Sequence, residues 1–393
     1  MIKSILKLIW KRKRRTSLMI IEMFISFLIL FALLSVIIKS YTQFVEPKGF
    51  SANDVWLAEI RFDNKNEDSG NSERDVMDLL KNNLKGLQGV SSVSNCSMNV
   101  PYARSISSTS MKFKEVQHHN IHILRTDENF QKVLQLSVSE GRWYGKEDAG
   151  QEEIPIVVNR QFKELFFPDE SAVGKKMTTD YNDDKYRIVG FVENYKSKGE
   201  LSDTYPLFFR MLGTQDVSNR LLIKTKSGVG KTIEEQLVNM LTSTAKSWTI
   251  NVKHMDVYKK NNFKRKLIPI LVFLSICVFL VVNIILGLFG ILLYNISRRK
   301  PEIGLRRSVG ASTIKIYQQF IGEMLMITTL GIIPALIVAV QFPILEVFDI
   351  NLTVYLAAIL LSAIIIYLLV FISSFIPSRY ASKIQPAIAL HEE

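Results

Sequence analysis

Residues 18–38 read LMIIEMFISFLILFALLSVII, an apolar run of 21 residues in which Glu22 is the only ionisable side chain. As a helix this run is about 31 Å long, which is close to the hydrocarbon thickness of a bilayer. Residues 267–294, 320–340 and 352–376 have the same character. Each run is longer than a typical buried core helix, so the sequence predicts a membrane protein with four transmembrane α-helices.

The composition agrees with a membrane location. The chain has 393 residues, of which 48% are hydrophobic and 22% charged, and its mean hydropathy is +0.15. These values exclude a disordered or collagen-like chain and argue against a purely soluble protein. Cys96 and Cys277 lie far apart in the sequence, and the pair supports neither a disulfide framework nor a cysteine-based metal site.

Positive charges predict the orientation of the chain. Residues 1–17 carry seven Lys and Arg and no acid, and residues 295–319 carry six against one Glu, whereas residues 341–351 carry none. Because cytoplasmic loops are enriched in Lys and Arg, we expect 1–17, 295–319 and the tail 377–393 in the cytoplasm. Segment 39–266 and the short loop 341–351 are then external. One group of bases on the external flank of the second run opposes this orientation: Lys259, Lys260, Lys264, Arg265 and Lys266.

The N-terminal segment 1–17 is basic and amphipathic, and we expect it to lie along the inner leaflet before the first span begins. A cleaved signal peptide is the alternative, but the apolar run is too long for one and no small-residue cleavage site follows it. The external segment balances 34 bases against 30 acids. Most of the excess positive charge therefore flanks the membrane, where anionic lipids are its expected partners and nucleic acid is not.

The external segment 39–266 shows alternating strand and helix patterns at both of its ends. We expect strand, helix and strand at 54–62, 72–84 and 90–94, and the same order at 220–225, 232–245 and 248–253. Shorter strands and turns occupy the middle. The sequence thus predicts a large α+β domain in which one subdomain, about 39–104 and 211–266, is split by an inserted part, about 105–210.

Three local patterns in this domain imitate chemical sites. Residues 225–232 (TKSGVGKT) resemble a phosphate-binding loop, but Thr225 replaces the first glycine. His118 and His122 have the spacing of a zinc helix, but His119 stands where a catalytic glutamate belongs, and the alternation from Met111 to Leu124 predicts a strand with His118 and His122 on one face. The third pattern is a polar turn with the carboxylates of Asp180, Asp183 and Asp184. We expect no catalytic, cofactor-binding or metal site in this chain.

The loop 297–312 reads SRRKPEIGLRRSVGAS. Pro301 suits the first turn of a helix and Glu302 complements the positive end of that helix. Gly310 can adopt a left-handed cap and Ser312 can begin the next helix. The sequence predicts a short helix that displays Arg306 and Arg307. Such a helix is either a basic topological anchor or a docking surface for a cytoplasmic partner.

This loop resembles that of the MacB/FtsX-like ABC transporter permeases, and the similarity extends over nearly the whole chain. It includes the basic N-terminus with one span, the large external domain and the three closing spans. The motifs that carry it are Glu302 to Ser312, Gly141-Arg142, Ile154 to Asn159, Gly174-Lys175, Ile188 to Gly190, Pro377 to Arg379 and Pro386 to Leu390.

The resemblance implies a bacterial inner-membrane permease that acts as a homodimer or heterodimer with a cytoplasmic ATPase. The loop helix would dock on that ATPase, with coupling residues Pro301, Glu302, Gly304, Arg306, Arg307, Gly310 and Ser312. The external domain would be periplasmic, with split porter-like parts. The spans would convey ATP-driven motion to it, which is called mechanotransmission. Whether a periplasmic adaptor and an outer-membrane channel take part stays open.

The predicted cytoplasmic parts are far smaller than a typical domain, so we expect the ATPase, with its ATP and Mg, on a separate chain. Within the spans, Glu22 either snorkels toward Arg14 or Arg15 or contributes to a dimer interface. The remaining candidates for helix packing are Asn283, Gly287, Gly290 and Pro334.

The main functional expectation is export or extraction of a peptide, an antibiotic or toxin, or a lipoprotein. The alternative within the same architecture is FtsX-like signalling to a periplasmic enzyme or sensor without transport. A membrane-anchored extracytoplasmic enzyme is the remaining alternative from another class.

Overall fold

The computed structural model describes residues 13–62, 73–97, 99–103, 107–179, 184–213, 216, 218–229, 232–298, 303, 305, 308–309 and 312–382. The chain forms two compact units. Met1–Thr42 and Leu267–Glu393 make up the helical unit, and Gln43–Lys266 make up the α+β unit.

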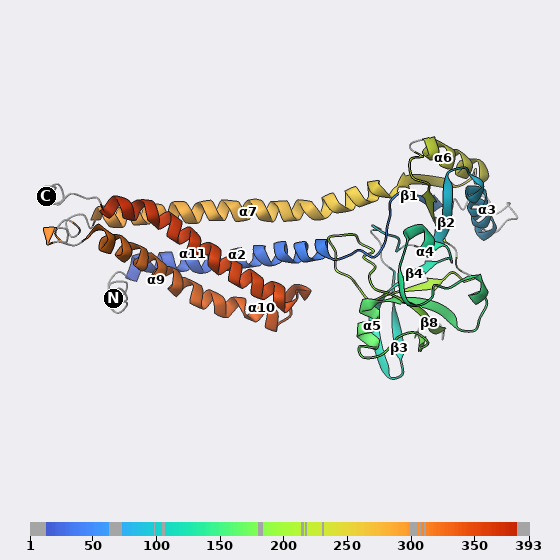
Figure 1. The fold of residues 1–393 in the computed structure, drawn as a ribbon, viewed down its shortest axis with the longest axis horizontal. Coiled ribbons are helices and arrows are strands. Elements are labelled where there is room, and N and C mark those ends of the chain that lie inside the picture. Colours follow the sequence, from blue (N-terminus) through green and yellow to red (C-terminus); the bar gives the residue numbers. More distant parts are fainter. Residues whose placement is uncertain are drawn as a thin grey trace. The chain divides into compact units, whose positions relative to one another are not determined.

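Four helices within the described residues are long and apolar enough to cross a membrane (Figure 1). They are α2 (Lys13–Val45), α7 (Met255–Arg298), α9 (Thr313–Ala339) and α11 (Leu352–Ser382). The α+β elements lie between α2 and α7 in the sequence, so the predicted fold class is confirmed. The short helix α10 (Gln341–Ile344) and the 3-10 turn η2 (Val347–Asp349) connect α9 to α11.

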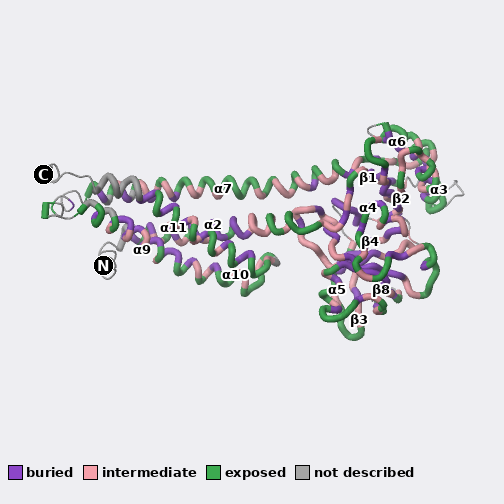
Figure 2. The backbone as a smooth tube through the Cα atoms, viewed as in Figure 1, coloured by how far each residue is buried: buried purple, intermediate pink, exposed green. Residues whose placement is uncertain are grey.

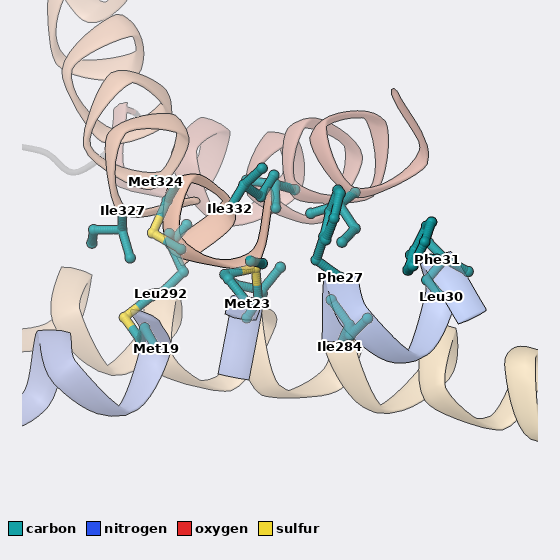
Figure 3. Packing of buried hydrophobic residues seen from close by; sticks show 14 of the residues in the cluster. Met19, Met23, Phe27, Leu30, Phe31, Ile284, Leu292, Met324, Ile327 and Ile332 are labelled. Carbon is teal, nitrogen blue, oxygen red and sulfur yellow. The ribbon is translucent and has the colours of Figure 1, made fainter. Parts of the chain in front are cut away.

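One apolar cluster holds the helical unit together, with buried side chains from all four helices. Figure 3 shows Met19, Met23 and Phe27 of α2 pointing at side chains of α7 and α9. The buried side chains that α7 contributes lie between Ile284 and Ile296, and the partly buried Cys277 packs against them. Only 6% of the residues in the most apolar stretch of α7 are buried, and Figure 2 shows α7 mainly in the colours of exposed and intermediate residues.

The α+β unit contains a split ferredoxin-like subdomain. Its strands are β1 (Val55–Arg61), β2 (Val90–Cys96), β10 (Arg220–Thr225) and β11 (Thr249–His254), paired antiparallel in the order β11-β1-β10-β2. Helix α3 (Glu73–Gly86) connects β1 to β2, and α6 (Thr232–Thr244) connects β10 to β11. This is the order and connectivity of the split βαβ arrangement.

The strand and helix patterns predicted for the ends of the external segment are confirmed by these six elements. Side chains alternate along β1 because successive residues of a strand point to opposite faces. Trp56, Ala58 and Ile60 pack with α3 and α6 on one face. Val55 and Leu57 pack on the other face with the short helix α4 (Phe130–Leu134).

The chain between β2 and β10 forms a closed ring of strands. These are β3 (Ser108–Phe113), β4 (Val116–Thr126), β6 (Ile154–Asn159), β7 (Lys176–Thr178), β8 (Lys185–Val192) and β9 (Leu207–Met211). They pair in the order β4-β3-β7-β8-β6-β9, and β9 pairs back with β4. A sheet that closes on itself is a small barrel. Its apolar cluster includes Met111, Ile156 and Phe208.

Three further short elements belong to the inserted part. Strand β5 (Val138–Gly141) pairs with β8 outside the ring, the 3-10 turn η1 (Lys146–Asp148) follows it, and helix α5 (Arg160–Phe166) follows β6. Arg142 holds the η1 turn through a bidentate ion pair with Asp148, at 2.6 and 2.7 Å.

Candidate functional site

The loop between α7 and α9 is the first candidate site. Of the predicted coupling residues, only Ser312 is described; those that lie outside the described residues are Pro301, Glu302, Gly304, Arg306, Arg307 and Gly310. Ser312 is the N-cap of α9, where its side chain accepts a hydrogen bond from the backbone N–H of Lys315. This is the helix start that the sequence predicts.

The described part of the loop presents an apolar surface. Ile303, Leu305 and Ser308 are helical, and Ile303 is only 4% exposed because it packs into the apolar cluster of the helical unit. Leu305 is 57% exposed and Val309 82% exposed. The N–H of Val309 donates to the carbonyl of Leu305 at 3.1 Å, which places both side chains on one side of a helical turn. The arginines dominate the charge pattern of this loop and the sequence prediction did not include this pair, although the i, i+4 spacing of Leu305 and Val309 signals it.

The predicted packing residues of the spans occupy different environments. Glu22 of α2 lies against Gly287 of α7, with a carboxylate oxygen 2.7 Å from the position a Cβ at Gly287 would occupy. Asn283 is exposed and donates to the carbonyl of Phe279 in its own helix at 2.9 Å. Gly290 has no atom within 4 Å of its Cβ position, and Pro334 lies exposed inside α9.

A tighter helix contact involves Gly331 of α9, which the sequence does not single out. A Cβ at Gly331 would lie 2.7 Å from Cβ of Met23 and 2.8 Å from the carbonyl oxygen of Ile20, both on α2. Among the glycines of the helices, nothing in the sequence around Gly331 sets it apart from Gly322, which has open space beside it.

A second candidate site gathers around Glu200 in the α+β unit. The Glu200 carboxylate lies 3.4 Å from Nζ of Lys48, 3.6 Å from Nζ of Lys259 and 3.5 Å from the hydroxyl of Tyr102. Burial opposes ionisation of this carboxyl group, but its backbone hydrogen bond and the two lysines outweigh burial and lower its pKa. Glu200 thereby joins the segment after α2 to the first turns of α7.

The loop around Glu200 holds both chain connections at further points. Lys196 is buried, and its Nζ lies 2.7 Å from a carboxylate oxygen of Glu46 and 2.7 Å from the carbonyl of Gln43. On the α7 side, Nζ of Lys266 donates to the carbonyl of Leu201 at 2.6 Å. We call this set of contacts the Glu200 junction. It consists of the loop residues 196–203 and their partners Gln43, Glu46, Lys48, Tyr102, Lys259 and Lys266. One loop of the inserted part is thus bonded to the end of α2 and to the start of α7.

The histidine pattern does not form a shared face. The run from Met111 to Leu124 is not one strand, because a turn at Lys114 divides it into β3 and β4. The register of the pair shifts between Thr109 and Met111, where Asn120 has a φ of 61°. This β-bulge inserts one residue, so the prediction that His118 and His122 share a face is wrong.

Each histidine instead has its own contact. His118 packs on Phe166, His119 is hydrogen-bonded to Ser110 at 2.7 Å, and the buried ring of His122 stacks on Tyr205. Within the described residues, no group of three or more His, Cys, Asp and Glu side chains is placed to hold a metal ion.

The buried His122 predicts a pH dependence of stability. Burial, together with the charge of Lys198, lowers the pKa of His122 to about 4. The unfolded chain binds this proton at a pKa of about 6.5, so the free energy of unfolding falls as the pH drops from about 6.5 toward 4. We expect His122→Phe, which keeps the ring, to flatten this part of a melting-temperature-against-pH profile. Identical slopes for the wild type and His122→Phe would contradict the assignment.

The other two patterns are described only in part. In the described part of the 225–232 stretch, the hydroxyls of Thr225 and Ser227 donate to the backbone carbonyl and the carboxylate of Asp54, at 3.1 and 2.9 Å. The stretch therefore connects β10 to α6, and Gly230 and Lys231 lie outside the described residues. Asp180 and Asp183 also lie outside them, whereas Asp184 accepts a hydrogen bond from the hydroxyl of Tyr186.

Comparison with known families defines the class of protein. The family described as "MacB-like periplasmic core domain" matches residues 16–240, and the one described as "FtsX-like permease C-terminal" matches residues 272–386. With four apolar helices and an α+β domain between the first two, these matches define a multi-pass membrane permease with an extracytoplasmic domain. The chain belongs to the MacB/FtsX-like permease family.

Individual relatives agree with this family. The chain is 25% identical over 310 residues to the macrolide export ATP-binding/permease protein MacB of Hahella chejuensis, covering 75% of this chain and 47% of that protein. The MacB protein of Bartonella quintana is 23% identical over 313 residues, with 75% and 46% covered. The chain thus spans about half the length of the curated relatives it matches.

Two solved structures are also similar to part of the chain. One is the periplasmic region of MacB from Actinobacillus actinomycetemcomitans, with a TM-score of 0.40 and 16% identity, covering 56% of this chain and 97% of that one. The other is the extracellular domain of the ABC-type transporter YknZ from Gram-positive bacteria, with a TM-score of 0.37 and 15% identity, covering 50% and 99%.

Proposed function

We propose that this chain is the permease subunit of a MacB/FtsX-type transporter that couples ATP hydrolysis by a separate cytoplasmic ATPase to movement of its external domain. The chain itself catalyses no reaction in this proposal, and ATP and Mg bind to the ATPase. It lies in a bacterial inner membrane with both termini and the loop 295–319 in the cytoplasm. Its cargo is exported or extracted on the outer side, and peptides, antibiotics or toxins, and lipoproteins are the candidate classes.

The observation that carries this proposal is the exposed apolar turn of Leu305 and Val309. Two large apolar side chains exposed on one side of a turn favour an interaction with another protein. Ile303 anchors the same segment in the apolar cluster of the helical unit. A partner docked on Leu305 and Val309 would therefore pull on α7 and α9, which contribute to that cluster.

The transmission step in this proposal runs along α7. This helix carries Lys259 and Lys266 of the Glu200 junction near its first residue, Met255, and ends at Arg298 directly before the loop. The helix continues through Pro269, so it would convey displacement along its axis, and the junction would pass it to the inserted part of the external domain. No conduit through the four helices is required.

The proposal also includes a second permease. Large apolar side chains of α7 are exposed along its middle part, among them Ile268, Leu271, Phe273 and Phe279. Lipid and a second copy or close relative of this chain would cover them. A periplasmic adaptor and an outer-membrane channel are further partners that this proposal admits but does not need.

Charge substitution on the apolar turn tests the coupling role. We expect Leu305→Asp with Val309→Asp to abolish co-purification of the ATPase and its stimulation by the permease, because two carboxylates would have to be desolvated in the contact. The measurement is ATPase recovery and turnover with the tagged full-length chain. Val116→Asp is the matched control, since Val116 is 54% exposed and lies in the α+β unit. Undiminished recovery of the ATPase with the double variant would overturn the docking role.

A further inference from the structure

The α+β unit contains a cavity of about 340 Å³ that no part of the proposed mechanism uses. Its walls come from β1, β10, residues 100–103 and the first turns of α7, residues 258–265. This volume lies within the range of small-ligand sites, and apolar or aromatic side chains and polar side chains contribute to the lining in nearly equal number. Tyr102 connects the cavity to the Glu200 junction, because it lines the cavity and donates to Glu200.

The charges inside the cavity leave one cation uncompensated. Glu59 is satisfied, since its carboxylate lies 3.2 Å from Nη2 of Arg220 and accepts a hydrogen bond from the hydroxyl of Tyr258 at 3.0 Å. Arg265 lines the same cavity, and within the described portion of the chain its guanidinium pairs with no carboxylate. The cavity therefore favours a ligand with a negative charge, and a guanidinium binds carboxylate and phosphate with two parallel hydrogen bonds.

A buried amide points to the second feature of the ligand. Asn262 is only 5% exposed and lines the cavity, yet none of the described residues forms a hydrogen bond with its side chain. The amide nitrogen and oxygen of Asn262 reach the cavity, where water or a ligand can pair with them. A carboxamide offers both donors and an acceptor, so the group that satisfies it best is another amide.

We propose that this cavity binds the carboxyl-terminal end of an extracytoplasmic peptide. Arg265 holds the terminal carboxylate and Asn262 pairs with the last peptide group. The buried side chains of Leu57 and Val100 contact the apolar side chain of the peptide. The inference deepens the proposed function, on which it rests, by naming peptides with a free carboxylate as the substrate class.

A lipid headgroup is the alternative source of a negative charge at Arg265. Its phosphate would satisfy the guanidinium as well as a carboxylate does. Phosphatidylglycerol carries no amide, however, so it cannot form with Asn262 the pair of amide-to-amide hydrogen bonds that a peptide group can form. The pairing requirement of Asn262 therefore favours a peptide, and the two ligands can be separated by experiment.

Calorimetric titration of the full-length chain in phosphatidylcholine nanodiscs tests the proposal, with N-acetyl-Ala-Leu-Leu as the acid and its C-terminal carboxamide as the matched probe. We expect the acid to bind and Arg265→Gln to weaken it about tenfold, whereas the carboxamide should bind equally weakly to both proteins. Asn262→Leu should weaken both probes. Lys264→Gln is the matched control, because Lys264 is the exposed base next to Arg265 and does not line the cavity.

Each other outcome overturns the peptide site. These outcomes are no binding of the acid, equal binding of acid and carboxamide to the wild type, or an unchanged affinity of the acid in Arg265→Gln. If phosphatidylglycerol in the nanodiscs displaces the acid from the wild type, the cavity is a headgroup site instead. The affinity of Asn262→Leu is interpreted only if this variant unfolds at the same temperature as the wild type. If it does not, Arg265→Gln alone tests the site, because Arg265 is exposed and its replacement should not affect folding. No ATPase is present, so failure here leaves the test at Leu305 and Val309 untouched.

Discussion

Replacing Gly331 with leucine is expected to separate α9 from α2 and to lower the stability of the chain by about 3 kcal/mol. The Cβ of the new side chain would lie 2.7 Å from Cβ of Met23 and 2.8 Å from the carbonyl oxygen of Ile20. That oxygen belongs to the backbone of α2, which cannot yield without moving the helix. Thermal unfolding of the purified chain in detergent measures the effect, and we expect a clearly lower melting temperature or no folded protein.

The matched control is Gly322→Leu in the same helix. No atom lies within 4 Å of the Cβ position of Gly322. Because leucine also has a better helix propensity than glycine, this variant should unfold at or above the wild-type temperature. Equal melting temperatures for the two variants would show that α2 and α9 do not approach each other closely at Gly331.

The second large effect is expected at Asp127, a buried carboxylate where β4 ends. It accepts hydrogen bonds from the hydroxyl of Ser94 at 2.6 Å and from the backbone N–H groups of Asn95 and Asn129 at 2.9 and 3.0 Å. It also forms an ion pair with Lys81 of α3. Asp127→Ala would leave these donors unpaired and the largely buried Lys81 ammonium with only Glu128, 3.8 Å away, at a cost of about 3 kcal/mol or more.

Chemical denaturation of the full-length chain measures this loss as a lower denaturant midpoint. Asp127→Asn keeps one acceptor but loses the charge, so its midpoint should lie between those of the wild type and Asp127→Ala. Asp169→Ala serves as the control, because Asp169 is an exposed carboxylate in the loop after α5. A wild-type midpoint for Asp127→Ala would mean that the Asp127 network does not hold β2, α3 and α4 together.

Local patterns predicted the elements at both ends of the α+β unit. Strand β10 begins and ends where its apolar run does, at Arg220 and Thr225, and α6 begins at Thr232 as expected. In each of these elements the apolar residues repeat with the spacing of a strand or a helix, and turn residues follow. No distant contact is therefore needed to define the element. The four membrane helices were predictable for the same reason, since length and apolarity are local properties.

The ring of strands could not be derived in this way. It closes where β4 pairs with β9, and these strands lie far apart in the sequence. Nothing local specifies that register. The alternation of apolar and polar residues from Met111 to Leu124 gave a wrong prediction for a related reason. Lys114 and Asn120 both adopt a positive φ, and each interrupts the strand. Neither residue type demands that conformation.

The candidate sites were predictable only in part. Charge drew attention to the arginines of the loop before α9, whereas Leu305 and Val309 acquire meaning only once Ile303 is known to face inward. The Glu200 junction depends on three segments, around Gln43, Lys196 and Lys266, that only the fold brings together. Gly331 likewise differs from other helical glycines solely through its neighbour on α2.

The split of the ferredoxin-like sheet has a consequence for the order in which the chain acquires its structure. Strand β1 ends at Arg61, but both of its neighbours, β10 and β11, begin only at Arg220 and Thr249. During synthesis the backbone hydrogen-bonding groups on both edges of β1 stay unpaired until the whole ring of strands has been made. Pairings between strands so far apart in the sequence also form slowly. Unpaired edges invite association with other chains. Folding of the inserted ring before β10 is paired would bring the ends of β2 and β10 together and would shorten the time in which β1 can aggregate.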